Sequence, residues 1–124
     1  MDYSQLSDFE INVAVFEAIH NGSPDYKEGE NGAMVFISFE GDIVNEDAVE
    51  VEVERGSFNP CANPADAWPI IMENMISVCA YKRANPGMKA VSWWEADSFG
   101  EHITLDDNPL RAAMIVFLMM QRIQ

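Results

Sequence analysis

The residues best suited to chemistry stand at the start of the last apolar segment, where Asn108 and Pro109 precede Arg111. Asn108 is a good helix N-cap, and Pro109 suits the first helical position because its missing N–H costs nothing there. The free N–H groups and positive dipole of a helix start attract anions, and the guanidinium of Arg111 adds planar donors. The sequence therefore predicts an anion-binding site at this helix end.

Two tryptophans could extend this site to a nucleotide-like ligand, because Trp68 and Trp94 offer rings on which a base can stack. The polar side chains that would add hydrogen-bonding edges are Asn108, Asp66 and Glu95. In the alternative interpretation both tryptophans anchor the core and Arg111 pairs with a nearby carboxylate. The candidate carboxylates are Asp106, Asp107 and Glu73. The two aspartates also oppose an anionic ligand, since they already present negative charge to this helix end.

A second candidate surface is a row of carboxylates. Residues 48–55 alternate strictly, with Val49, Val51 and Val53 on one side of the chain and acidic residues on the other. The acidic residues are Glu50, Glu52 and Glu54, called the acidic row below. A period of two predicts a strand with one solvated face. Such charges discourage pairing with another chain at a sheet edge, and they are also suited to binding a basic protein.

The overall charge limits the classes of partner. The chain of 124 residues has a formal net charge of -14 at pH 7, which excludes ordinary nucleic-acid binding through basic side chains. An acidic protein can instead meet basic proteins or imitate DNA, and solubility alone is the simpler explanation of the charge.

The nucleophiles and metal ligands form no recognisable catalytic pattern. Cys61 and Cys79 are too few and too far apart for a disulfide framework or a zinc site. Cys79 lies in a predicted strand, where we expect a small buried residue, and nothing places it beside His102. His20 and His102 lack a second ligand at helical or hairpin spacing. We expect no catalytic residue, metal or cofactor, and therefore no enzyme.

The secondary-structure pattern predicts a mixed fold. Ser7 and Glu10 have the spacing of a capping box, which predicts a helix to about His20. The polar residues 21–31 predict a mobile loop, and Gly41-Asp42 predicts a turn. The predicted strands are residues 33–39, 48–55, 76–81 and 89–96, and residues 101–105 are either a final short strand or an extended link. Pro69 divides the next helical region, which predicts one turn over residues 65–68 and a second short helix over 69–73.

The last helix is apolar on every side from Ala112 to Met120, so it must be buried in the core or against a second copy. It is too short for a membrane span, which needs roughly 20 apolar residues. We predict a single α+β domain over residues 1–124, with one antiparallel sheet of about four strands on two or three helices. The amount of apolar helix surface also predicts a homo-oligomer, most simply a dimer.

The second half of the chain resembles the NinX-like family of small phage and prophage proteins. The resemblance is carried by Asp66-Ala67-Trp68-Pro69-Ile70-Ile71-Met72-Glu73, Ile76-Ser77, Trp94-Glu95-Ala96 and Pro109-Leu110-Arg111-Ala112-Ala113-Met114. The opening Leu6-Ser7-Asp8-Phe9-Glu10-Ile11-Asn12 is also similar to the family's first helix. The resemblance implies a phage or prophage accessory protein and supplies no catalytic residues.

The function expected from these features is binding that counteracts a host defence or regulatory system. In one mechanism, the site at Arg111 sequesters a small anionic nucleotide-like signal. In the other, the acidic row binds and inhibits a basic host protein that handles nucleic acid, as a DNA mimic would. A small-molecule enzyme is a distant third. The amino terminus shows no signal peptide, so we expect a protein of the host cytoplasm with no membrane partner.

Overall fold

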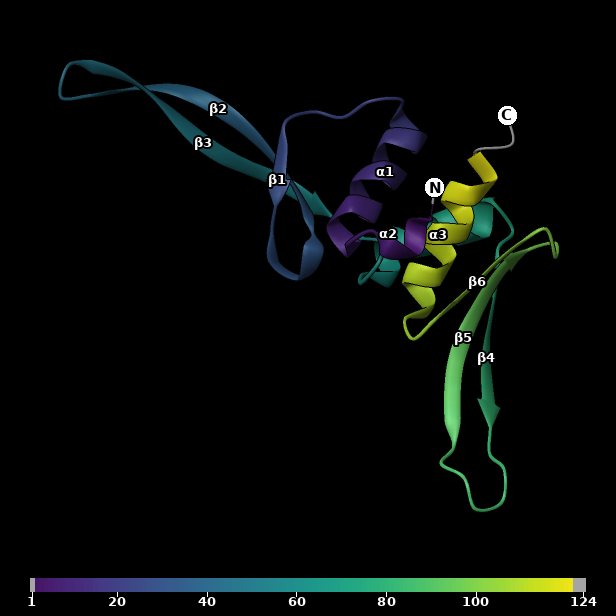
Figure 1. Cartoon of the computed structure of the whole chain (residues 1–124). Helices are drawn as coiled ribbons and strands as arrows, with labels where there is room; N and C mark the ends of the chain where they lie inside the picture. The colour runs from purple at the N-terminus through teal and green to yellow at the C-terminus, as the bar shows by residue number, and fades with distance from the viewer. Residues whose placement is uncertain (1, 122–124) are drawn as a thin grey trace.

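The computed structural model describes residues 2–121, with the side chains of Asp42 and Val44 excepted. Figure 1 shows the helices gathered in the centre, with two long β hairpins extending from them in different directions. The elements in chain order are η1 (Tyr3–Gln5), α1 (Asp8–His20), β1 (Tyr26–Glu28), η2 (Glu30–Gly32), β2 (Met34–Val44), β3 (Asp47–Phe58), α2 (Pro64–Glu73), β4 (Ser77–Arg83), β5 (Val91–Ser98), β6 (His102–Asp106) and α3 (Pro109–Gln121). The predicted α+β class is confirmed.

The strands form two separate antiparallel sheets, with the orders β1-β2-β3 and β4-β5-β6. The sequence predicts one sheet of about four strands, so the division into two sheets of three is a correction. Strand β1 and the first two residues of the short helix η2 lie within residues 21–31, which the sequence assigned to a loop. Strand spacing alone does not say which strands share a sheet, because pairing is decided by where the helices hold the strand ends.

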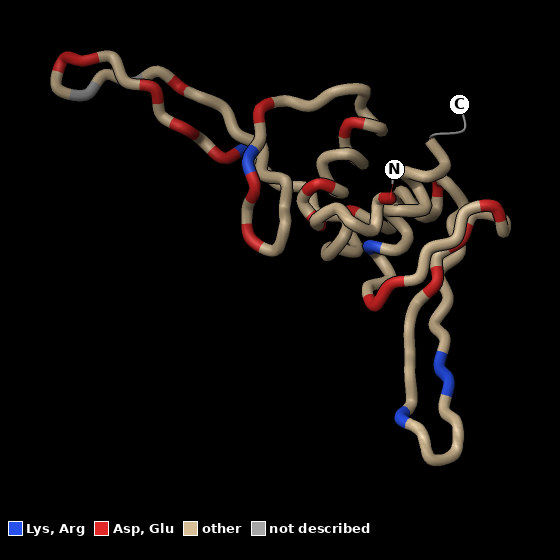
Figure 2. Tube along the Cα trace, in the orientation of Figure 1, with Lys and Arg blue, Asp and Glu red and all other residues tan. Residues whose placement is uncertain are grey.

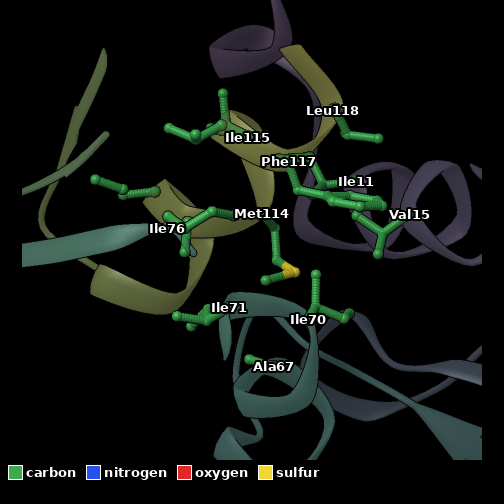
Figure 3. Packing of buried hydrophobic residues seen from close by; sticks show 14 of the residues in the cluster. Ile11, Val15, Ala67, Ile70, Ile71, Ile76, Met114, Ile115, Phe117 and Leu118 are labelled. Carbon is green, nitrogen blue, oxygen red and sulfur yellow. The ribbon is translucent and has the colours of Figure 1, made fainter. Parts of the chain in front are cut away.

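Helix α3 is the centre of the core. Every residue from Ala112 to Leu118 is at most 5% exposed, and the helix packs on α1, α2 and strands β4 to β6. Figure 3 shows Met114 pointing from α3 toward Ile70 of α2, while Phe117 lies beside Ile11 of α1. The predicted burial of this helix is confirmed. A single chain covers it, so its burial needs no second copy. Within residues 2–121, no helix is long and apolar enough to cross a membrane.

Helix α1 begins as its sequence predicts and carries a buried polar residue that the sequence analysis missed. The Ser7 hydroxyl accepts from the backbone N–H of Glu10 at 3.1 Å, and the Glu10 carboxylate accepts from that of Ser7 at 3.0 Å. Asn12 is fully buried. Its amide donates to the carbonyl of Gly32 at 2.9 Å and to Asn59 Oδ1 at 2.8 Å, and Asn12 Oδ1 accepts from the N–H of Cys61 at 3.1 Å. This side chain therefore ties α1 to η2 and to the segment before α2.

The β2–β3 hairpin is longer than predicted and turns later. Its ladder runs to the pair Val44 and Asp47, so the turn is Asn45-Glu46 and the predicted turn at Gly41-Asp42 is wrong. Asn45 and Glu46 have φ values of 51° and 71°. Two successive residues with positive φ are what a two-residue type I′ hairpin requires, and this turn has the twist that flanking strands favour.

Helix α2 is continuous, which corrects the prediction of two short pieces. Asn63 caps it by accepting from the N–H of Ala65 at 3.0 Å, and Pro69 lies inside the helix. A proline at the sixth helical position removes one backbone hydrogen bond. Ile70 and Ile71, which directly follow it, are buried against the core. Burial of these side chains offsets the lost bond.

The second sheet packs one face on α3. Ala96 and Thr104 are directly paired in the ladder and are both buried, and the Thr104 hydroxyl donates to the sulfur of Met119 at 3.5 Å. Since side chains alternate across a strand, the neighbouring residues on β4, β5 and β6 lie on the opposite face, which is open to solvent. Cys79 is on that open face and is exposed, contrary to the expectation that it is buried.

Replacing Met114 by Ala tests the central role of α3. Because Met114 is fully buried, Met114→Ala should lower the free energy of unfolding by about 2–5 kcal/mol through lost burial and the cavity left behind. Met72→Ala is the matched control, since Met72 is 60% exposed on α2 and should change stability by no more than about 0.5 kcal/mol. Urea unfolding followed by circular dichroism measures both, and equal effects would contradict this assignment of the core.

Candidate functional site

Arg111, the centre of the predicted anion site, is held by protein groups. Its Nη1 lies 2.7 Å from Asp8 Oδ1 and its Nε lies 3.1 Å from Asp106 Oδ2. Its Nη2 donates to the backbone carbonyls of Ser4 at 3.0 Å and Leu6 at 2.8 Å. The side chain is 14% exposed. Arg111 therefore joins α3 to the chain before α1, to α1 and to β6, and a ligand must displace some of these partners to reach it.

Asn108 caps α3 as predicted, and its amide is also fully engaged. Its Oδ1 accepts from the N–H of Leu110 at 2.9 Å and of Arg111 at 3.3 Å, while its Nδ2 donates to the carbonyl of Cys61 at 2.7 Å. Asp106 Oδ1 accepts from the N–H of Asn108 at 2.9 Å. Asp106 thus supplies negative charge at the helix start, where the sequence analysis placed an anionic ligand.

Among the remaining residues of the predicted ligand site, Trp94 is paired in the sheet with Asp106, the carboxylate that binds Arg111. Trp68 is 57% exposed on α2, so it is neither enclosed nor a core anchor. Asp66 accepts from the backbone N–H of Asn59 at 2.9 Å. Trp94 and Glu95 are consecutive in β5 and so point to opposite faces of the sheet. Ligand binding at these residues stays a prediction.

Trp94 lines an open hollow at the second sheet. The hollow has a volume of about 570 Å³, and the charged side chains among its lining residues are those of Lys82 and Asp107. Asp66 lines a different hollow, beside Pro69 and Phe117. The tryptophan and the aspartate that the sequence analysis placed in one site therefore belong to two separate surfaces.

The acidic row lies on the β2–β3 hairpin, and both faces of this hairpin are exposed to solvent. Residues 34–58, called the acidic arm below, contain seven carboxylates and one arginine. The register pairs Glu52 with Phe39 and Val51 with Glu40. Directly paired residues share a face, so each face of the arm mixes apolar and acidic side chains. Phe39 is 53% exposed and Val51 is 44% exposed, which corrects the prediction of one solvated face and one buried face.

The basic residues divide into two groups. Lys27 lies 2.7 Å from Glu52 and 3.2 Å from Glu54, Arg55 pairs with Glu40, and Arg111 is paired as described. In the described part of the chain the other three basic side chains form no ion pair, and all belong to the β4–β5 hairpin: Lys82, Arg83 and Lys89. Figure 2 shows this separation, with acidic residues along one hairpin and basic residues toward the tip of the other.

The open face of the second sheet, called the outer face below, is an apolar surface that the sequence analysis missed. Its exposed apolar side chains are Tyr81 (44% exposed), Val91 (49%), Ile103 (52%) and Leu105 (58%). Tyr81 stacks on Trp93 with ring centroids 5.7 Å apart and an angle of 11° between the planes. The alternation of Val91, Trp93 and of Ile103, Leu105 was visible in the sequence, but only the position of α3 shows which side is uncovered.

Charged residues mark the two ends of the outer face. Arg83 is paired with Val91 toward the hairpin tip, while Asp97 is paired with Ser77 and Ile103 at the other end. A hydrogen bond to the Glu95 carboxylate and its negative charge raise the pKa of Tyr81. The outer face therefore changes along the strands from basic at Arg83 to acidic at Glu95 and Asp97, with aromatic and aliphatic side chains beside these charges.

The thiols and carboxylates are not grouped for metal binding in the part of the chain that is described. Burial raises the pKa of the Cys61 thiol to about 12, so it is protonated at neutral pH. Cys79 is exposed on the outer face. Among residues 2–121 no group of three His, Cys, Asp or Glu side chains is placed to hold a metal ion. The expectation of a protein that acts by binding stays a prediction.

The geometry defines a small acidic α+β protein with a helical core and two exposed hairpins that differ in charge. Residues 2–121 match the family described as bacteriophage P22 NinX. The chain belongs to this family of phage proteins, as the resemblance of its sequence indicated. No curated protein and no solved structure matches the chain significantly.

Replacing Arg111 separates a structural role from ligand binding. Arg111→Ala removes four hydrogen bonds, two of them to carboxylates, so it should lower the free energy of unfolding by about 2–3 kcal/mol. Arg111→Lys should cost less but not be neutral, because an ammonium group lacks the planar arrangement of donors. Lys89→Ala is the control, since Lys89 is exposed and forms no ion pair within the described chain. Thermal unfolding that leaves Arg111→Ala as stable as wild type would contradict the structural role.

Proposed function

We propose that this protein is a phage accessory protein that acts by binding, and that its acidic arm binds a basic surface of a host protein that handles nucleic acid. The supporting observation is the arm itself, an eleven-residue and a twelve-residue strand whose acidic side chains extend from the helical core. An arm with seven carboxylates and one arginine repels nucleic acid and attracts surfaces that bind phosphates.

The spacing of the acidic row suits such a surface. Glu50, Glu52 and Glu54 recur every second residue of β3, so their charges repeat at roughly 7 Å along one face. Lys27 and Arg55 neutralise carboxylates toward the base of the arm. Toward the turn, Glu46, Asp47 and Glu50 form no ion pair within the described chain. The unneutralised end of the arm is therefore the part that would enter a basic groove.

Apolar side chains on the arm would add to the charge. Phe39 lies beside Glu52, and Val51 lies beside Glu40, each partly exposed. Interfaces gain most of their free energy from apolar and aromatic side chains that become buried, while surrounding charges increase the association rate and the specificity. The mixed faces of the arm combine both contributions on one strand pair.

Neutralising the acidic row tests this proposal. The triple variant Glu50→Gln, Glu52→Gln, Glu54→Gln should stay within about 1 kcal/mol of wild type, because it loses only exposed ion pairs to Lys27. It should lose a partner that immobilised wild-type protein captures from host lysate. The matched control neutralises three exposed glutamates outside the arm, Glu30, Glu73 and Glu101, and should retain the partner.

Two further measurements on the captured partner distinguish a DNA mimic from another acidic ligand. Raising the salt concentration should weaken binding strongly, since exposed charges are screened within about 10 Å at 0.1 M salt. Duplex DNA should compete with the acidic arm for the same surface. A partner that binds the triple variant equally well, without dependence on salt, would contradict the proposal.

Sequestration of a nucleotide-like signal, the other mechanism predicted from the sequence, has less geometric support because Arg111 and Asn108 already have protein partners. Calorimetry with cyclic and linear nucleotides tests it directly. Heat from wild type that is absent with folded Arg111→Lys would favour sequestration, and no heat from any nucleotide with wild type would exclude it.

A further inference from the structure

We infer that the outer face of the second sheet is a surface for self-association, on which a second copy of this chain stacks face to face with its strands antiparallel. This inference is independent of the proposed function, because it concerns β4 to β6 and not the acidic arm. The occupant is a second copy because the outer face carries opposite charges at its two ends, Arg83 and Asp97, and exposed apolar side chains between them on both sides of Glu95, which is hydrogen-bonded to Tyr81.

The complementarity follows from the register. Arg83 and Asp97 belong to the same face but are six residues apart along the β4–β5 ladder, which is roughly 20 Å. In the proposed dimer a twofold axis lies between the two stacked sheets, perpendicular to β5 and level with the midpoint between Trp93 and Glu95. Rotation about this axis makes the strands of the second copy run in the opposite direction. The rotation places the position of Arg83 along the strands of one copy over that of Asp97 in the other. By symmetry it also places the position of Asp97 in the first copy over that of Arg83 in the second. Both contacts pair opposite charges, as an isologous interface requires.

The middle of the outer face supplies apolar contact. In this arrangement the stacked Tyr81 and Trp93 of one copy lie over the level of Cys79, Glu95 and Leu105 in the other, where Glu95 is already hydrogen-bonded to Tyr81 of its own chain. Stacked sheets are about 10 Å apart, a distance that aromatic and leucine side chains from both sides fill. Burial of Leu105 and Ile103, which are 58% and 52% exposed in one chain, would drive association.

The charge of the rest of the protein restricts where two copies can meet. A net charge of -14 on each chain opposes contact between most surfaces. Within the described residues, the three basic side chains without an ion pair are all on the β4–β5 hairpin. Of these three, Arg83 is on the outer face, so an approaching copy meets there a basic side chain without an ion pair next to exposed apolar side chains.

A charge exchange tests the arrangement with the full chain. Sedimentation equilibrium of wild type should show a dimer with a dissociation constant in roughly the micromolar range. Arg83→Asp and Asp97→Arg should each raise that constant by at least about tenfold, because each places like charges together twice. An equimolar mixture of the two variants should form a heterodimer, since both contacts then pair opposite charges. Lys89→Asp, a charge reversal in the hairpin loop away from the face, should leave the wild-type constant unchanged.

Apolar and thiol probes give independent readings. Leu105→Asp should prevent dimerisation, whereas the same exchange at Val51, 44% exposed on the acidic arm, should not. Cys79 is exposed near the twofold axis and Cys61 is buried, so a short bismaleimide should link two copies through Cys79 and not after Cys79→Ser.

Three results would overturn the inference. Wild type that is monomeric at concentrations on the order of 100 µM would exclude a dimer of useful strength. A dimer that persists in both charge reversals and in Leu105→Asp would place the interface elsewhere. Loss of the dimer in the triple glutamine variant of the acidic row would instead assign the basic hairpin tip to the acidic arm of another copy.

Discussion

The burial of helix α3 is the constraint on which the rest of this structure depends. Its residues from Ala112 to Leu118 are covered on one side by α1 and α2 and on the other by the second sheet. A chain of 124 residues has enough apolar surface to enclose one such helix completely. Little remains to cover the ends of the two hairpins, which therefore extend into solvent with apolar side chains exposed. The hairpin surfaces that are free to bind a partner are therefore a consequence of the concentration of apolar residues around α3.

Polar contacts at the amino end of α3 determine how the core elements are joined. Arg111 holds Asp8 of α1, Asp106 of β6 and two carbonyls before α1, while Asn108 and Asn12 hold opposite sides of the Cys61 backbone. These bonds satisfy groups that would otherwise be buried without partners, and a charged side chain that already has four such bonds is poorly suited to capture a ligand. The same arginine that looked like a binding residue is better explained as the connection between the first and last helices.

The two hairpins divide the remaining charge. One carries the acidic row next to apolar side chains, and the other carries the unpaired basic residues next to an aromatic stack. In the two proposals made above, the acidic arm binds a basic partner and the second sheet binds a second copy. Self-association would then present two acidic arms from one particle, and two linked sites bind more tightly than either alone when the partner can reach both.

Local sequence determined the elements that depend on neighbouring residues. The capping box of α1 and the N-cap and apolar length of α3 were correctly predicted, because each is a property of spacing within one helix. The α+β class and the family were also correctly predicted, from the order of such segments along the chain. Tertiary structure decided the properties that depend on register and packing. The pairing of β2 with β3 placed Phe39 beside Glu52, so the alternation that predicts one dry face instead produced two mixed faces. Pro69 stayed inside α2 because the residues beside it are buried, and the packing of α3 on one face of β5 decided that Trp94 is on the covered side and Glu95 on the open side. Arg111 and Asp8 are more than a hundred residues apart in the chain, so no spacing in the sequence encodes their contact. Only the packing of α1 on α3 brings the two side chains together.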